Sequence, residues 1–289
     1  MPLKPGQEHT RGCVFCGIAD GRESALFFRD GHRGFVDSRR GDPSAPWSDE
    51  RPEVFVFENQ FLFFDLTSLV IPLDHPPTNG RRFYAQQSDL WRDLGEVGRT
   101  ARDHALQVID WMQDRNPQRA ASGFRIFCNF GSMGEQSQPH AHLQVHAAPE
   151  LDLSRFAPTG EPWLDAVQRN GLELLHETES TVFYNALPVL AAGKSNLWQV
   201  TVSVGFSSPH RALPPLAALA VPRSEVSQRE LWGDVGQVGA DVVDFAETQS
   251  PGGFRVLSNF PGQQADEDSG PAHILVVGGD YLGLYADYF

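Results

Sequence analysis

Polar and apolar residues alternate one by one over residues 140–147. The polar positions hold three histidines and a glutamine: His140, His142, Gln144 and His146. Side chains in a strand point alternately to its two faces, so all four would share one face. The alternation therefore predicts a strand with a histidine-lined side and an apolar side.

Other segments carry their own periodicity. Apolar residues recur at helical spacing from Leu90 to Met112, which predicts a long helix. Residues 124–130 have the pattern of a strand, and residues 131–139 are rich in glycine and polar groups, which predicts a loop. Two further apolar runs end in Pro72 and Pro222, and both are expected to be strands.

Two pairs of matching segments occur in the same order along the chain. LWRDLGEVG (90–98) and LWGDVGQVG (231–239) are identical at six of nine positions, and FRIFCNF (124–130) parallels FRVLSNF (254–260). Residues 271–279 take the place of the histidine strand in the second copy. We predict two units, residues 1–149 and 150–289, each α+β with an antiparallel sheet and a packed helix.

Composition narrows the classes of function. The formal net charge of −14 argues against binding nucleic-acid backbones. We find no apolar run of membrane-spanning length and no apolar core in residues 1–12, so neither a membrane segment nor a signal peptide is expected. Three cysteines do not make a disulfide scaffold, which favours the cytoplasm, with Cys128 a buried strand thiol.

Histidines at alternate positions after a glycine-rich loop have a chemical interpretation. Neutral imidazole is a nucleophile towards phosphorus and a common metal ligand. The backbone N–H groups of such a loop can hold phosphate oxygens. The alternative is that these side chains form a solvated polar face of the strand. If the strand carried only one histidine, this alternative would be the favoured interpretation.

The segment FRIFCNFGSMGEQSQPHAHLQVHAAP (124–149) resembles the signature region of the histidine triad superfamily. Within it, HAHLQ (140–144) is similar to the His-x-His-x-Gln of the transferase branch. That branch includes galactose-1-phosphate uridylyltransferase and diadenosine tetraphosphate phosphorylase. The resemblance implies two histidine-triad-like halves in one chain, joined across a pseudo-two-fold axis, with the second half shaping the substrate pocket.

The resemblance also implies a reaction. His142 would attack the α-phosphorus of a nucleotide, nucleotide-sugar or dinucleotide donor, and a small-molecule acceptor would then attack the nucleotidyl-histidine. Gln144 would bind the phosphoryl oxygen, a replacement that goes with transfer rather than hydrolysis. The residues implied in nucleotide or phosphate binding are Asn59, Asn129, Gln136 and Ser137. A dinucleoside polyphosphate phosphorylase, a nucleotide hydrolase and a non-enzymatic nucleotide-binding module remain alternatives.

The family's structural zinc site has candidate ligands in this chain: Cys13, Cys16, His75 and His140. Two cysteines and two histidines suit tetrahedral Zn²⁺. A redox pair or two unrelated thiols are the other interpretations of Cys13 and Cys16. His146 and His273 are expected to take no part in catalysis, and the chain to act as a monomer or homodimer.

Overall fold

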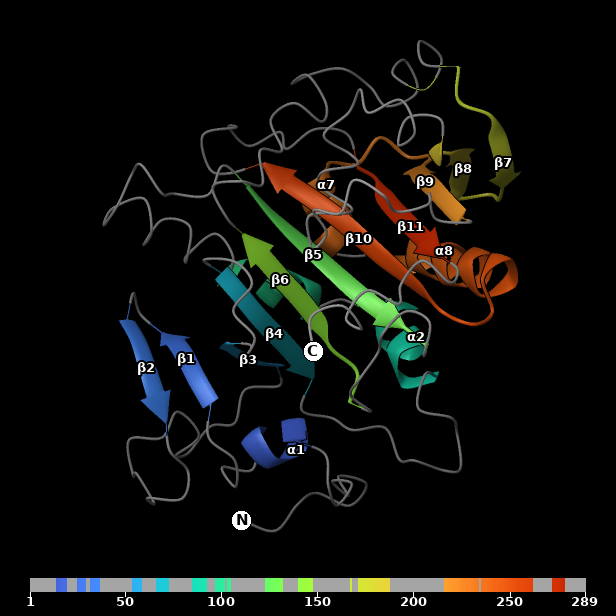
Figure 1. Cartoon of the computed structure of the whole chain (residues 1–289). Coiled ribbons are helices and arrows are strands. Elements are labelled where there is room, and N and C mark those ends of the chain that lie inside the picture. Colours follow the sequence, from blue (N-terminus) through green and yellow to red (C-terminus); the bar gives the residue numbers. More distant parts are fainter. Residues whose placement is uncertain are drawn as a thin grey trace, which may run out of the picture.

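Strands from both ends of the chain form one antiparallel sheet (Figure 1). The computed structural model describes residues 14–19, 25–29, 32–36, 54–58, 66–72, 85–92, 97–101, 103–104, 123–131, 140–147, 167, 171–187, 216–233, 235–261 and 272–278. Within these residues the strand order is β2-β1-β3-β4-β6-β5-β10-β11-β9-β8-β7. The predicted α+β class with an antiparallel sheet is therefore confirmed.

The strands are short, as is usual in globular proteins. Their bounds are β1 (Ala25–Arg29), β2 (His32–Val36), β3 (Val54–Glu58), β4 (Leu66–Pro72), β5 (Gly123–Phe130), β6 (Leu143–Ala147), β7 (Leu174–Glu177), β8 (Thr181–Asn185), β9 (Leu216–Pro222), β10 (Phe254–Pro261) and β11 (Ile274–Gly278). Both apolar runs that end in proline are strands, β4 and β9, as the sequence predicts.

Four helices have defined bounds within the described residues: α1 (Val14–Ala19), α2 (Ala85–Arg92), α7 (Gln228–Gly233) and α8 (Gly236–Gln249). Residues 97–101 and 103–104 are also helical, in agreement with the helix predicted there. α7 begins with a capping box, because Ser227 Oγ accepts from the Glu230 N–H and the Glu230 carboxylate accepts from the Ser227 N–H. None of the described helices is long and apolar enough to cross a membrane.

The two halves of the chain meet at the β5–β10 pair. The matching segments run antiparallel there, with Phe124 opposite Phe260 and Phe130 opposite Phe254. The register is therefore symmetric about the pair Phe127–Leu257. On either side of this pair the order is β4-β6-β5 and β10-β11-β9.

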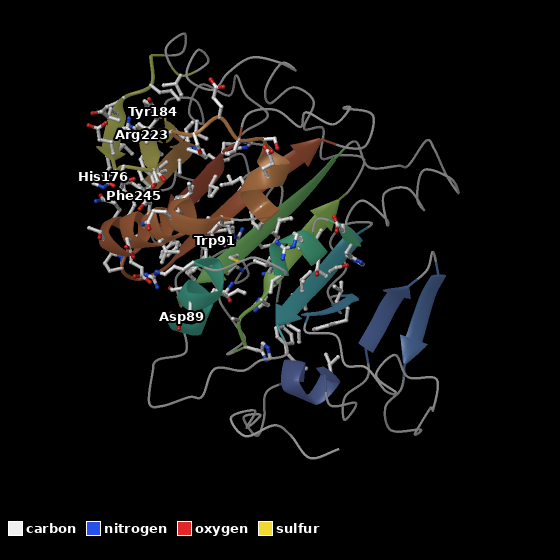
Figure 2. The ribbon with its side chains drawn as sticks, turned by 180° about the vertical axis from the view of Figure 1, so that it is seen from behind. Asp89, Trp91, His176, Tyr184, Arg223 and Phe245 are labelled. Carbon is white, nitrogen blue, oxygen red and sulfur yellow. The ribbon has the colours of Figure 1, made fainter. Side chains whose placement is uncertain are left out.

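Helices α2 and α8 cover one face of the sheet, as seen from behind in Figure 2. On this face, Trp91 of α2 and Trp232 of α7 contact each other edge to face, with ring centroids 5.1 Å apart. Both rings are fully buried. Ile126 and Val145 pack in the same apolar cluster, whereas Phe127 belongs to a separate cluster. Because strand side chains alternate, Phe127 lies on the opposite face of the sheet. The two faces thus have different chemistry.

Candidate functional site

Strand β6 begins later than the alternation predicts. Leu143 is the first residue of β6, and His140 and His142 lie in the connection before it. The prediction that the strand starts at His140 is therefore wrong. The backbone N–H and carbonyl oxygen of His142 bind the Gln87 side chain instead of a neighbouring strand.

His142 is oriented by its own chain. Its imidazole Nδ1 lies 2.9 Å from the backbone carbonyl oxygen of His140, and the residue is only 4% exposed. A carbonyl oxygen can only accept a hydrogen bond, so Nδ1 carries a proton. In the neutral ring the lone pair is then on Nε2.

The side chain of Gln87 in α2 hydrogen-bonds to both backbone polar groups of His142, its N–H and its carbonyl oxygen. Gln87 Nε2 donates to the His142 carbonyl oxygen at 2.6 Å, and Gln87 Oε1 accepts from the His142 N–H at 2.9 Å. The side chain is fully buried. A buried amide that satisfies one donor and one acceptor behaves like a short piece of neighbouring strand. It fixes the backbone from which the imidazole projects.

Sequence reasoning missed Gln87, which lies 55 residues before His142. A signal was nevertheless present, because Gln87 and Gln228 both stand three residues before the leucine of the repeated LW motif. A polar residue retained at the same place in both copies, on an otherwise apolar helix face, is a candidate for a structural hydrogen bond.

Cys128 of β5 adds a weaker contact to the same carbonyl. Its Sγ lies 3.5 Å from the His142 oxygen. The residue is fully buried, which confirms the predicted strand thiol, and burial raises the pKa of the thiol far above its usual range. Cys128 therefore stays protonated and acts as a donor rather than as a nucleophile.

Phe15 of α1 packs against both histidines. Its ring centroid lies 5.1 Å from that of His142 and 6.2 Å from that of His140, edge to face in both cases. Phe57 of β3 supports it at 5.4 Å. The N-terminal helix is thereby placed beside the histidines, across more than 120 residues of sequence.

Gln144 lies on the face of the sheet opposite the helices. Its neighbours Leu143 and Val145 pack in the helix-side cluster, and its register partner on β5 is Phe127. Gln144 is partly exposed, whereas Leu143 and Val145 are fully buried. A partly exposed amide two residues after His142 can reach a bound ligand without disturbing the core.

If the β5–β6 register is extended by two residues, Asn129 of β5 lies opposite His142. It is 4% exposed. Its Oδ1 accepts from Arg255 Nε of β10 at 2.7 Å, and the Arg255 guanidinium carbon lies 5.3 Å from the centre of the Phe127 ring. The second half of the chain thus contributes a cation next to a residue predicted to bind phosphate.

Comparison with known proteins gives distant structural likenesses. No protein-family model matches the chain, and no curated protein matches it in sequence. An ADP-glucose phosphorylase from Arabidopsis thaliana with bound ADP-glucose is 12% identical with a TM-score of 0.44, over 88% of each chain. A uridylyltransferase is 13% identical with a TM-score of 0.43, over 81% of this chain and 75% of the other.

A yeast Ap4A phosphorylase in complex with Ap4A is 16% identical with a TM-score of 0.36, over 78% of this chain and 57% of the other. These three solved structures are members of the histidine triad superfamily, and their folds match this chain only distantly.

Several predicted site residues lie outside the described part of the chain. They are Asn59, Gln136 and Ser137 of the predicted nucleotide site, and Cys13 and His75 of the predicted zinc site. The backbone of Cys16 lies in α1. Within the described residues, no group of three or more histidine, cysteine or acidic side chains could hold a metal ion. The zinc site stays a prediction.

His273 occupies the corresponding place before β11. It is 6% exposed, and Ser258 Oγ donates to its carbonyl oxygen at 2.7 Å, where Cys128 contacts the carbonyl oxygen of His142 in the first half. Leu275, fully buried in the apolar cluster of the Phe127 face, replaces Gln144. The second half of the chain therefore has a histidine at this place without the polar residue two positions later.

Proposed function

We propose that the protein is a nucleotidyltransferase that works through a covalent nucleotidyl-histidine at His142. The observation that carries the proposal is the hydrogen bond between His142 Nδ1 and the His140 carbonyl oxygen, 2.9 Å long. In the neutral ring, the proton on Nδ1 leaves the lone pair on Nε2. A buried imidazole in this tautomer is ready to attack an electrophilic phosphorus.

The first step forms a bond between His142 Nε2 and the α-phosphorus of the donor. The bond from that phosphorus to the leaving-group oxygen breaks, and the oxygen leaves with the electron pair. The ring then carries a positive charge, which the His140 carbonyl dipole stabilises through the Nδ1–H. In the second step an acceptor oxygen attacks the same phosphorus and the imidazole leaves as a neutral group.

Gln144 and Asn129 are proposed to bind the phosphoryl oxygens. An amide is neutral at every working pH and cannot protonate a leaving group. The leaving group and the acceptor should therefore be stable as anions, as phosphates are. This favours a nucleotide-sugar or dinucleotide donor with a small phosphate-type acceptor. Asn59, Gln136 and Ser137 are proposed to complete the nucleotide pocket.

We also propose that the chain consists of two tandem histidine-triad-like units, residues 1–149 and 150–289. The symmetric register about Phe127 and Leu257, and the contact between Trp91 and Trp232 of the repeated motifs, support this proposal. The first unit keeps the catalytic residues. The second is proposed to shape the substrate pocket.

A structural zinc ion is proposed at Cys13, Cys16, His75 and His140. His140 is 1% exposed, and its ring lies against Phe15, the residue directly before Cys16. A buried imidazole beside the cysteine-bearing helix fits this ligand set. When bound, the ion would pin α1 to the catalytic segment.

The test is covalent labelling. The protein is incubated without acceptor with donors that carry ³²P at the α-phosphate (ADP-glucose, UDP-glucose and Ap4A), then denatured and counted. We expect an acid-labile label on the parent protein and none on His142→Ala. His273→Ala is the matched control, because it removes the corresponding histidine of the second copy, and it should label like the parent.

Three outcomes would change the assignment. If His142→Ala labels as well as the parent, the covalent mechanism is wrong. Release of mononucleotide to water without acceptor would make the protein a hydrolase. Nucleotide binding with no turnover across the donors would make it a binding module.

A further inference from the structure

Arg255 lies in the second half of the chain but contacts the predicted phosphate site of the first. It is directly opposite Asn129 in the β5–β10 register. The guanidinium is 3% exposed and packs against the Phe127 ring. Burying a cation is costly unless it makes specific hydrogen bonds. Arg255 makes such a hydrogen bond at the centre of the sheet, from its Nε to Asn129 Oδ1 at 2.7 Å.

This bond decides the orientation of the Asn129 amide. An arginine Nε–H can only donate, so the atom of Asn129 that faces it must be the oxygen. The amide NH₂ then points away from β10. β5 lies between β10 and β6 in the sheet, so the other side of Asn129 is the side of His142.

We propose that Arg255 is a positioning residue for the transfer reaction, acting through Asn129. It holds the Asn129 NH₂ towards the space beside His142, where the α-phosphoryl group of the nucleotide would sit. The inference rests on the proposed nucleotidyl transfer and adds that the second half orients a phosphoryl-oxygen donor in the first. A donor fixed before the reaction stabilises developing charge without a reorganisation cost.

The chain supplies a matched control in Arg125. It lies opposite Asn259 in the same pair of strands, at the position related to Arg255 by the symmetric register. Arg125→Lys therefore makes the same chemical change in the same strand pair, two residues from the centre on the other side. Its register partner is Asn259 and not Asn129.

The decisive experiment is a double-mutant cycle on the rate of His142 labelling. Single-turnover labelling is measured with the donor that labels the parent, for Arg255→Lys, Asn129→Ala and the double variant. We expect Arg255→Lys to slow labelling roughly tenfold, about the effect of one hydrogen bond, with donor binding changed much less. In the Asn129→Ala background the same substitution should have no further effect.

The result that overturns the proposal is an additive loss in the double variant, or an equal loss in Arg125→Lys. Arg255→Gln replaces Arg255→Lys if the lysine variant does not fold, as judged by circular dichroism and the unfolding midpoint.

A second measurement separates this proposal from the proposed function. The side-chain NH₂ signals of Asn129 are identified in ¹⁵N-asparagine-labelled protein by their loss in Asn129→Ala. They should shift in Arg255→Lys and stay in place in Arg125→Lys. If no donor labels the parent but this shift occurs, the transfer reaction fails while the orientation of Asn129 by Arg255 stands. If the signals do not move in Arg255→Lys, the positioning role is overturned whatever the labelling result.

Discussion

The side chain of Gln87 forms two hydrogen bonds with the backbone of His142, one to its N–H and one to its carbonyl oxygen, directly before β6. α2, which carries Gln87, is in turn bound to α8 of the second half, because Ser88 Oγ donates to the Glu247 carboxylate at 2.7 Å. The backbone of the proposed nucleophile is therefore supported by elements from both halves of the chain.

Gln87→Leu should reduce both stability and labelling. It leaves the buried His142 N–H without its partner and removes one of the two donors to the carbonyl oxygen, so unfolding should cost about 2 kcal/mol less. Labelling of His142 should slow by roughly tenfold because the imidazole is held less firmly. Urea unfolding and single-turnover labelling measure the two effects.

Gln86→Leu, the same change one residue earlier in α2, is the control for residue type. A stability loss at Gln86 equal to that at Gln87 would show that the hydrogen bonds to His142 are not responsible.

His104 should make stability depend on pH. Burial lowers its pKa from 6.5 to about 4, and its Nε2 lies 2.9 Å from Ser68 Oγ. Between these pH values the unfolded chain binds a proton that the folded chain does not, so stability is lost as pH falls from 6.5 towards 4. The full loss would approach about 3 kcal/mol.

The measurement is the free energy of unfolding at pH 7 and pH 5 for the parent and for His104→Gln, which keeps an amide for Ser68 but does not titrate. The difference between the two pH values should be smaller in the variant, because the carboxylates contribute equally to both proteins. An unchanged difference would mean that His104 titrates normally in the fold.

Asp241 of α8 should contribute far more to the free energy of unfolding than Asp244 on the same helix. Asp241 is 9% exposed and accepts from Thr181 Oγ1 and Gln237 Nε2, both at 2.9 Å, and from Thr178 Oγ1. Asp241→Ala removes the acceptor that these three donors share, among them the hydroxyl of the fully buried Thr181, and should cost about 2–4 kcal/mol.

Asp244→Ala is the matched comparison, because Asp244 is 68% exposed and pairs with Arg92 at the surface. It should cost less than about 1 kcal/mol. Thermal or urea unfolding of the two variants checks the contrast, and equal losses would contradict the structural role of Asp241.

The proposed zinc ion predicts a metal content. Purified protein should contain roughly one zinc ion per chain by elemental analysis, and a chelator should lower its unfolding midpoint. Cys16→Ser should lose the metal, whereas Cys128→Ala should keep it because Cys128 is a buried thiol of the sheet. Full zinc content in Cys16→Ser would remove this residue from the ligand set.

The sequence predicted the elements whose pattern is local. β5 and the apolar runs of β4 and β9 were recognisable because alternation or continuous apolar character decides a strand within a few residues. The start of β6 was predicted three residues too early, because the alternation continues through His140 and His142, although a side chain from α2 takes the backbone hydrogen bonds of His142.

Contacts between distant segments could not be read in the same way. The pairing of Arg255 with Asn129 spans 126 residues, and its partner was predictable only after the two FR-x-x-x-NF segments were known to run antiparallel. The histidine pattern indicates His142 and Gln144 as candidates for the chemistry, which stays a prediction, but the tautomer of His142 depends on a carbonyl that no pattern specifies.

The β5–β10 pair has a consequence for how the protein is made. β5 leaves the ribosome long before β10, so until Pro261 has been synthesised one side of β5 is an unpaired edge that other chains can join. Closing so long a loop is slow. Synthesis of a truncated first half should therefore yield aggregation-prone material, and the sheet should be complete only after Pro261 has been synthesised.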